Sequence, residues 1–361
     1  MNEPQTPATA MRIAAVIPCY NEALSIAQVV AEFRAALPEA EIHVFDNNST
    51  DGTAAIARAS GAWVTHVAAP GKGNVVRRMF ADVEADVYVT VDGDATYDVA
   101  SARRLVDALV EGNLDMVVGS RVDDGQNALT YRAGHRFGNR LLTGAVAQLF
   151  GGGLTDMLSG YRVFSRRYVK SFPALSQGFE IETELTVHAL ELRMPYAEEG
   201  TAYSTRPEGS HSKLSTYRDG WRILKTIGKL FVSERPLQFF SIVAAVLAIG
   251  ALALAVPLFM TYAHTGLVPR LPTAVLATGA MLAALLGIAA IALAIPLFIT
   301  YMHTGLVPRL PTAVLATGAM LAAMLSMVCG VVMHAIRLAR RETKRLRYLG
   351  VPGVGLFRRK A

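Results

Sequence analysis

The stretch VYVTVDGDATYD (Val87–Asp98) decides the fold, because an apolar run of strand length ends directly in two aspartates. Asp92 and Asp94 are two positions apart, so in an extended segment their carboxylates point to the same side. Gly93 between them allows the backbone to bend close to a ligand. Paired carboxylates suit a hard divalent ion such as Mg²⁺ or Mn²⁺ that takes its other oxygens from a diphosphate. The alternative interpretation is a solvated Asp-Gly turn.

Outward from this stretch, strand-like and helix-like segments alternate along the chain. Apolar runs of strand length occur at 12–18, 41–45, 62–67, 87–91 and 116–118. Helical segments are predicted at 22–37, 53–60, 77–84 and 99–110. Nearly all-apolar strands that alternate with helices predict an α/β fold, with a mostly parallel sheet and helices on both of its faces.

Polar clusters follow four of the predicted strands. They are PCYNE (Pro18–Glu22), DNNSTDG (Asp46–Gly52), DGD (Asp92–Asp94) and GSR (Gly119–Arg121). In such sheets ligands bind beyond the carboxyl ends of the strands, so the four clusters predict one site at this edge. The second cluster is equally typical of an Asx turn and helix cap. GKGN (71–74) resembles a phosphate-binding loop, but a surface turn explains it as well, because the P-loop spacing is absent.

In this order and spacing, the motifs VIPCYNE, DNNSTDGT, GKG and DGDATYD resemble the inverting family 2 glycosyltransferases. Within that family the chain is most similar to the polyprenyl-phosphate sugar synthases, the group of dolichyl-phosphate mannose synthase and undecaprenyl-phosphate glucosyltransferase. The resemblance covers roughly residues 13–230 and implies the nucleotide-sugar-binding fold of the GT-A type. It is specific for the family and much less specific for the sugar.

The resemblance implies a role for each matching residue. The nucleotide-sugar donor would be bound by Pro18, Tyr20, Asn21, Glu22, Asp46, Asp51, Lys72 and Asp92. Mg²⁺ or Mn²⁺ would be held by Asp92, Asp94 and Thr96. The catalytic residues would be Asp94, Arg121, Asp156 and Arg206. The phosphate of the acceptor would be bound by Arg121, Arg136, Ser159, Arg162, Arg206 and Lys213.

One departure from the family bears on the acceptor. The cluster EIETE (Glu180–Glu184) is not the Glu-Asp pair that many members use as a base. A lipid monophosphate, with a second pKa near ~6, is already mostly ionised and needs charge neutralisation more than deprotonation. The sequence therefore predicts transfer to a polyprenyl phosphate. The alternatives are another lipid hydroxyl with Glu182 as the base, or a non-catalytic membrane scaffold, against which the intact Asp92 and Asp94 argue.

The composition changes sharply beyond residue 235. Hydrophobic residues make up 52% of the chain, and between 238 and 336 the only charged side chains are Arg270 and Arg309. Three apolar segments, 238–262, 273–301 and 312–336, are each long enough to span a bilayer. They predict an integral membrane protein with C-terminal transmembrane helices.

The net charge of +6 comes largely from basic residues on either side of the apolar region. Anionic lipid explains this placement better than nucleic acid, which we exclude as a partner. The start of the chain lacks the features of a secretory signal. Cys19 and Cys329 form no disulfide framework. Both observations predict a cytoplasmic catalytic domain, and the sequence leaves open a homo-oligomer.

The apolar region contains a tandem duplication, since Leu252–Leu286 and Ile291–Leu325 agree at 30 of 35 positions. Three crossings would place its two basic flanks on opposite sides, whereas their charges favour one side, so the number of crossings stays open. The predicted domains are a disordered tail (1–11), a catalytic domain (12–215), a juxtamembrane amphipathic helix (216–235), a transmembrane region (236–337) and a basic cytoplasmic tail (338–361).

Overall fold

The computed structural model describes residues 11–122, 133–207, 209, 216–236, 238–239, 242, 264 and 332–354. Most of the predicted transmembrane region and its duplication lie outside these residues, as do the first ten residues, Lys213 and the side chain of Arg136. Within the described ranges, none of the helices combines the length and apolar composition that a bilayer crossing requires. The chain divides into two units, one of residues 1–230 and 341–361, the other of 231–340.

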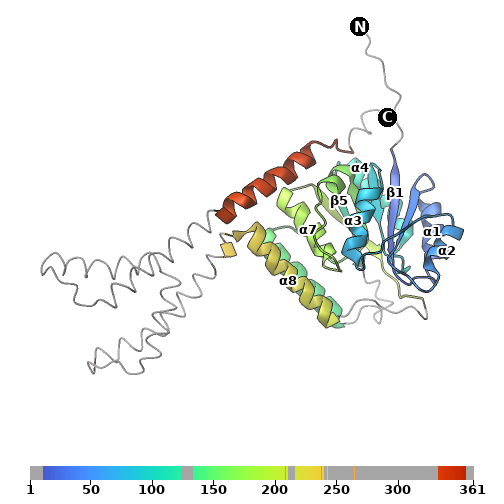
Figure 1. Ribbon diagram of the computed structural model, residues 1–361, viewed down its shortest axis with the longest axis horizontal. Coiled ribbons are helices and arrows are strands. Elements are labelled where there is room, and N and C mark those ends of the chain that lie inside the picture. Colours follow the sequence, from blue (N-terminus) through green and yellow to red (C-terminus); the bar gives the residue numbers. More distant parts are fainter. Residues whose placement is uncertain are drawn as a thin grey trace, which may run out of the picture. The chain divides into compact units, whose positions relative to one another are not determined.

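The first unit contains a seven-stranded sheet (Figure 1). Its strands are β1 (Ile13–Cys19), β2 (Glu41–Asp46), β3 (Trp63–His66), β4 (Val87–Thr90), β5 (Met116–Val122), β6 (Arg162–Ser165) and β7 (Tyr196–Ala202). They are ordered β3-β2-β1-β4-β6-β5-β7. All pairs are parallel except those of β6, which runs antiparallel to β4 and β5. The prediction of a mostly parallel sheet is confirmed, and the antiparallel strand is an addition to it.

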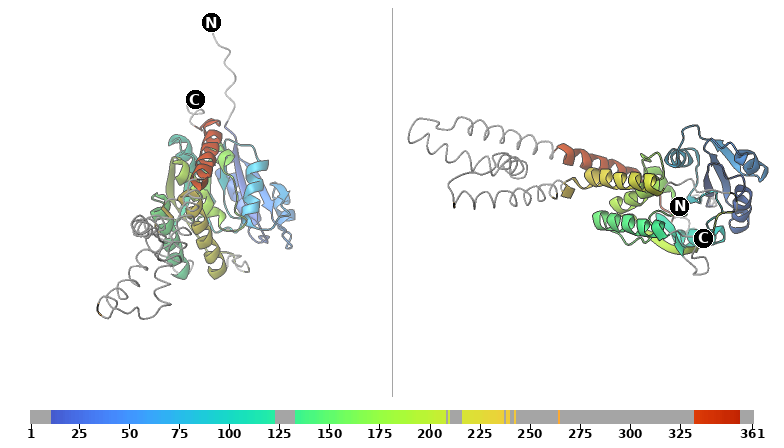
Figure 2. Two further views of the ribbon diagram at one scale, coloured as in Figure 1. Left: turned by 60° about the vertical axis from the view of Figure 1, so that its left-hand side comes forward. Right: turned by 90° about the horizontal axis from the view of Figure 1, so that it is seen from below.

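Helices cover both faces of this sheet (Figure 2). They are α1 (Ile26–Ala36), α2 (Thr53–Ala59), α3 (Lys72–Asp82), η1 (Val99–Ser101), α4 (Ala102–Glu111), α5 (Ala133–Phe150), α6 (Arg166–Ser171), α7 (Ile181–Leu192) and α8 (Thr216–Glu234). Several predicted boundaries were wrong, and two of them concern residues of the predicted site. The helix predicted from 77 begins at Lys72, so the GKGN stretch is the first turn of α3. The strand predicted to end at Val118 continues to Val122, so Gly119–Arg121 lies inside β5.

The core lies on both sides of the sheet because successive strand residues point to opposite faces. In β1, Ile13, Ala15 and Ile17 pack with residues of α1 and α4. Ala14 and Val16 pack on the other face with residues of α3, α6 and α7. Burial of both strand faces explains why the strands are continuous apolar runs in the sequence. Because most of the strands are parallel, their polar carboxyl ends lie at one edge of the sheet.

The C-terminal segment also belongs to the first unit. Residues 341–349 are helical, and the chain from 341 to 354 contacts the rest of this unit (red in Figure 1). The hydroxyl of Tyr348 donates to Asp115 Oδ2 over 2.6 Å, and Lys344 Nζ lies 3.0 Å from Glu191 Oε2. Val354 is 2% exposed within the core. Residues 341–354 of the predicted basic tail are thus folded onto the rest of the first unit.

We expect Tyr348→Phe to destabilise the first unit. Asp115 is fully buried, and the substitution removes one of the donors to its carboxylate, the others being Ser165 and Arg167. The loss of a hydrogen bond to a buried charge costs about 2 kcal/mol. The melting temperature of the full chain in detergent should fall by roughly 4–8 °C. Tyr20→Phe, at a half-exposed tyrosine, is the control. An unchanged melting temperature for both variants would contradict the prediction.

Candidate functional site

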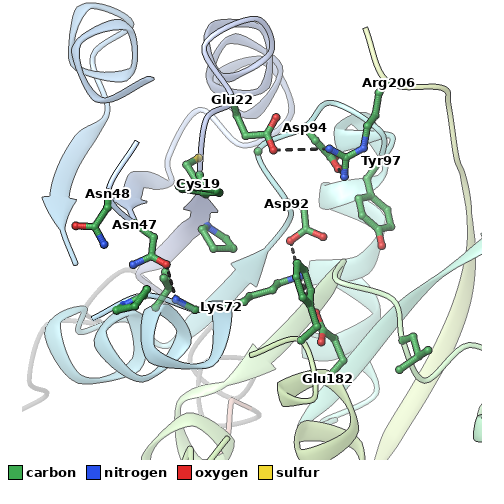
Figure 3. A pocket seen from close by; sticks show the side chains of 18 of the residues that line it. Cys19, Glu22, Asn47, Asn48, Lys72, Asp92, Asp94, Tyr97, Glu182 and Arg206 are labelled. Carbon is green, nitrogen blue, oxygen red and sulfur yellow. Dashed lines mark hydrogen bonds and ion pairs between the residues drawn. The ribbon is translucent and has the colours of Figure 1, made fainter. Parts of the chain in front are cut away.

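A pocket of about 560 Å³ opens at the carboxyl ends of β1 and β4 (Figure 3). Eight of the residues assigned by resemblance line it: Pro18, Tyr20, Glu22, Lys72, Asp92, Asp94, Arg121 and Arg206. They come from five places in the chain, namely the end of β1, the start of α3, the loop after β4, the strand β5 and the segment after β7. The fold therefore brings these eight residues together at the edge of the sheet where the sequence predicts a site.

Asp94 is held from two sides. Its Oδ1 accepts hydrogen bonds from the hydroxyl and the amide of Thr96, at 2.6 and 3.2 Å. Its Oδ2 lies 2.5 Å from Nη2 of Arg206. Burial and the charge of Asp92 raise the pKa of Asp94, and Arg206 opposes this shift. Thr96 is buried and in this structure orients Asp94, while its predicted contact with a metal stays a prediction.

Asp92 is bridged to a third carboxylate by a lysine. Lys72 Nζ lies 2.6 Å from Asp92 Oδ1 and 2.6 Å from Glu182 Oε1 (Figure 3). Burial acts to lower the pKa of Lys72, but the two carboxylates outweigh it and raise that pKa above its usual value. Burial raises the pKa of Glu182, and the charge of Lys72 opposes the shift. Lys72 therefore stays protonated and brings a permanent positive charge into the lining of the pocket.

The glycines beside Lys72 allow α3 to begin against another part of the backbone. Gly71 has φ +114°, and a Cβ there would lie 2.3 Å from the carbonyl oxygen of Gln177. A Cβ on Gly73 would lie 2.2 Å from the carbonyl oxygen of Ser176. Since these are backbone atoms, no larger residue fits without a shift of the chain. The GKG motif therefore places Lys72 next to the segment that leads into α7, the helix that carries Glu182.

Arg121 and Asp156 form a bidentate ion pair. Nε and Nη2 of Arg121 each lie 2.7 Å from an oxygen of Asp156, and Asn139 Nδ2 donates to Oδ1 at 2.8 Å. Asp156 is buried, which acts to raise its pKa, but the bonds from Arg121 outweigh burial and lower it. Fork-to-fork geometry fixes the plane of the guanidinium, which lies 5.6 Å from the ring centre of Tyr203.

Three residues assigned to the donor lie beside the pocket instead of lining it. Asp51 accepts from the amides of Ala23 and Thr53, so it forms an Asx turn ahead of α2 and ties two loops together. Asn21 Oδ1 accepts from the amide of Thr50. Asp46 is buried, and its Oδ1 has no hydrogen-bond partner within the described part of the chain. The Asx turn predicted within DNNSTDG is seen, whereas the predicted side-chain cap is not, because the N-cap of α2 is Gly52. Asn47 and Asn48 of the same loop line the pocket.

Ser159 and Arg162, assigned to the acceptor phosphate, are fully buried. The guanidinium of Arg162 donates to the carbonyl oxygens of Met157, Ser159 and Glu182 and to the hydroxyl of Thr186. Ser159 Oγ donates to the carbonyl oxygen of Gly119 at 2.6 Å. A contact with an acceptor would break these bonds, so the structure favours a supporting role for both.

Sequence reasoning missed several residues of the pocket. Tyr97, Leu158, Phe179, Tyr203 and Ile223 line it without having been assigned to it. Tyr97 lies within DGDATYD, and its hydroxyl oxygen accepts a hydrogen bond of 2.9 Å from the amide of Gly160. That motif could have indicated Tyr97 as a residue of the site. Nothing in the sequence indicated Phe179 or Ile223, because a single apolar residue in a pocket cannot be told from a core residue without the tertiary structure.

The two aspartates fit a divalent ion. Among the described residues no three His, Cys, Asp or Glu side chains are grouped as a metal site. Asp92 and Asp94 are carboxylates, the ligand type that Mg²⁺ and Mn²⁺ prefer, and Asp92 is partly exposed to the pocket. Two protein carboxylates suffice for an ion that takes further oxygens from a substrate phosphate and water.

Comparisons with known proteins agree with this geometry. Residues 14–172 match the family described as glycosyl transferase family 2. The chain is 50% identical to an uncharacterized protein of Shigella flexneri over 193 residues, 54% of this chain and 94% of that protein. It is 35% identical to Glycosyltransferase AglJ of Haloferax volcanii over 68% of this chain and 80% of that one.

Two further matches concern the group and the fold. The chain is 29% identical to a dolichyl-phosphate hexose transferase of Haloferax volcanii, over 62% of this chain and 95% of that protein. Among solved structures, the glucosyl-3-phosphoglycerate synthase of Mycobacterium tuberculosis in complex with Mn²⁺, UDP-glucose and phosphoglyceric acid matches with a TM-score of 0.50 at 23% identity. That match covers 62% of this chain and 80% of that chain. At this identity the match supports the GT-A-like fold alone.

Proposed function

We propose, given that the chain belongs to glycosyl transferase family 2 and is a glycosyltransferase, that it transfers a hexose from a nucleotide-diphosphate sugar to a polyprenyl phosphate with anomeric inversion. The observation that carries this proposal is the convergence of Asp92, Asp94, Lys72 and Arg206 on one pocket. Paired carboxylates flanked by two cations match the needs of a diphosphate leaving group with a divalent ion. The names of relatives that act on dolichyl or undecaprenyl phosphate support the acceptor.

The acidic and the basic residues of the pocket would have different roles. Asp92 and Asp94 would hold Mg²⁺ or Mn²⁺, with Thr96 behind Asp94. When bound, the ion neutralises charge that develops on the departing diphosphate. Lys72 lies beside Asp92 and adds a fixed positive charge. Arg121, held in plane by Asp156, would contact the phosphate of the acceptor.

The position of Glu182 favours a phosphate over a hydroxyl acceptor. A hydroxyl acceptor needs a general base within hydrogen-bond reach. Glu182 Oε1 is engaged by the ammonium of Lys72 at 2.6 Å, and the carboxylate is buried. An ionised phosphate needs no such base. We therefore place the alternative, transfer to another lipid hydroxyl, second.

The surface of α8 supports attachment to a membrane. Ile223 and Ile227 are buried against the catalytic domain, whereas Trp221 is 68% and Leu224 47% exposed. Arg222 is exposed on the same helix, and basic residues beside an exposed tryptophan are typical of helices at an anionic bilayer surface. We propose that the apolar region anchors the catalytic domain at the cytoplasmic face.

The folded C-terminal segment bears on the number of crossings. Residues 341–354 pack on the catalytic domain, as does α8 up to Leu230. A chain that leaves and returns to one domain crosses a bilayer an even number of times. We propose that the basic segment after the apolar region lies on the cytoplasmic side. To test this topology, cysteines are introduced at 267, at 306 and after 354. They are then probed with an impermeant maleimide on intact and on opened cells. Labelling of the C-terminal cysteine in intact cells would overturn it.

The function is tested with the purified full chain in detergent. It is incubated with Mn²⁺, polyprenyl phosphate and a panel of radiolabelled nucleotide sugars. We expect one donor to yield an acid-labile lipid-linked sugar. Donor hydrolysis without transfer would show that the acceptor is wrong. Transfer to a diacylglycerol that is lost in Glu182→Gln would favour the hydroxyl acceptor. Absence of both transfer and nucleotide binding would favour a membrane scaffold.

A further inference from the structure

Each aspartate of the pair is matched by a basic side chain. Lys72 Nζ lies 2.6 Å from Asp92 Oδ1, and Arg206 Nη2 lies 2.5 Å from Asp94 Oδ2 (Figure 3). Two carboxylates in a partly buried pocket repel each other unless positive charge is nearby. The two cations supply that charge within the chain itself. They occupy two of the carboxylate oxygens that a divalent ion would use.

Each cation also has a second carboxylate within reach. Lys72 lies 2.6 Å from Glu182 Oε1, in the first turn of α7, and both side chains are largely buried. Arg206 Nη1 lies 3.7 Å from Glu22 Oε1. A cation that gives up its aspartate therefore need not move into solvent. The second carboxylate retains it at the wall of the pocket.

A divalent ion and an ammonium group cannot share one oxygen of Asp92, because like charges at contact distance repel strongly. We propose that Lys72 is the counter-cation of Asp92 in the unliganded protein, that it yields Asp92 to the divalent ion, and that Glu182 then holds it beside the donor diphosphate. This inference rests on the proposed function. It makes Glu182 a positioning residue that acts through Lys72.

The exchange couples the binding of metal and donor. Metal alone must displace Lys72 from Asp92, so its affinity is reduced by the lost ion pair. When the diphosphate is present, the displaced ammonium gains a new anionic partner, and the two ligands bind cooperatively. Glu182 lowers the energetic cost of the exchange because Lys72 keeps one of its two partners throughout.

The test measures Mn²⁺ binding without turnover. Free Mn²⁺ is quantified by electron paramagnetic resonance in titrations of the full chain in detergent, first alone and then with UDP or GDP. We expect Lys72→Met to bind Mn²⁺ alone about threefold more tightly or better, in the range of coupling between groups in contact. The same variant should bind the nucleoside diphosphate more weakly. Glu182→Gln should bind Mn²⁺ alone more weakly, because Lys72 then relies on Asp92.

The opposite signs separate this role from a merely structural one. If the buried ion pair only supports the fold, both variants weaken Mn²⁺ binding, and the proposal is overturned. Arg77→Met removes a positive charge from the same helix at a residue that bonds to the carbonyl oxygen of Ala174, and it should leave Mn²⁺ affinity unchanged. If the wild type binds Mn²⁺ and nucleotide but Lys72→Met gains no affinity, the inference alone fails. A wild type that binds neither overturns the proposed function as well.

Discussion

Asp94→Asn is expected to abolish sugar transfer, with a loss on the order of 10³-fold or more, the size seen when a group that stabilises transition-state charge is removed. The carboxylate is buried, and its two oxygens are engaged by Thr96 and Arg206. An amide of the same shape preserves the volume but removes the negative charge that a divalent ion requires. It also turns one oxygen into a donor facing the guanidinium of Arg206.

The loss should appear in the radiolabel assay and in a lower affinity for Mn²⁺ in the titration. Asp98→Asn is the matched control, because Asp98 lies four residues further along the same segment and caps η1 through the amide of Ala100. It should keep most of the activity. If Asp94→Asn retained wild-type transfer and Mn²⁺ affinity, the assignment of the metal site to this pair would be refuted.

Arg162→Ala is expected to produce the largest loss of stability. The side chain is 1% exposed and donates to the carbonyl oxygens of Ser159, Met157 and Glu182. Truncation leaves buried carbonyl groups without a donor and opens a cavity beside β6. Both effects together should cost about 3–5 kcal/mol. The melting temperature of the full chain in detergent should fall on the order of 10 °C.

Arg166→Ala provides the comparison, since Arg166 begins α6 directly after the same strand and forms an exposed ion pair with Glu84 at 3.1 Å. That pair should contribute at most about 1 kcal/mol. The outcome also tests the role assigned by resemblance. An Arg162→Ala protein that melts like the wild type but has lost affinity for polyprenyl phosphate would show that Arg162 contacts the acceptor.

Much of the fold was predictable from local patterns. Apolar runs of strand length and helical periodicity show which side chains of a segment are buried, and this information is local. Nearly every segment in the first half of the chain forms the helix or strand predicted for it. The position of the site was predictable too, because parallel strands place their ends at one edge. The boundaries at Lys72 and Val118 were wrong because glycines there permit regular structure that their usual role in turns conceals.

The sequence by itself determined the α/β class and the family and predicted the pair Asp92 and Asp94, because local periodicity and short motifs carry these signals. Only the tertiary structure decided which charges meet. Lys72 joins Asp92 to Glu182, Arg121 is held by Asp156, and Tyr348 reaches an aspartate 233 positions away. It also decided that Arg162 is buried in the interior, 1% exposed. Partners far apart in sequence have no local signature, since their contact arises from the folding of the whole sheet and the helices that cover it.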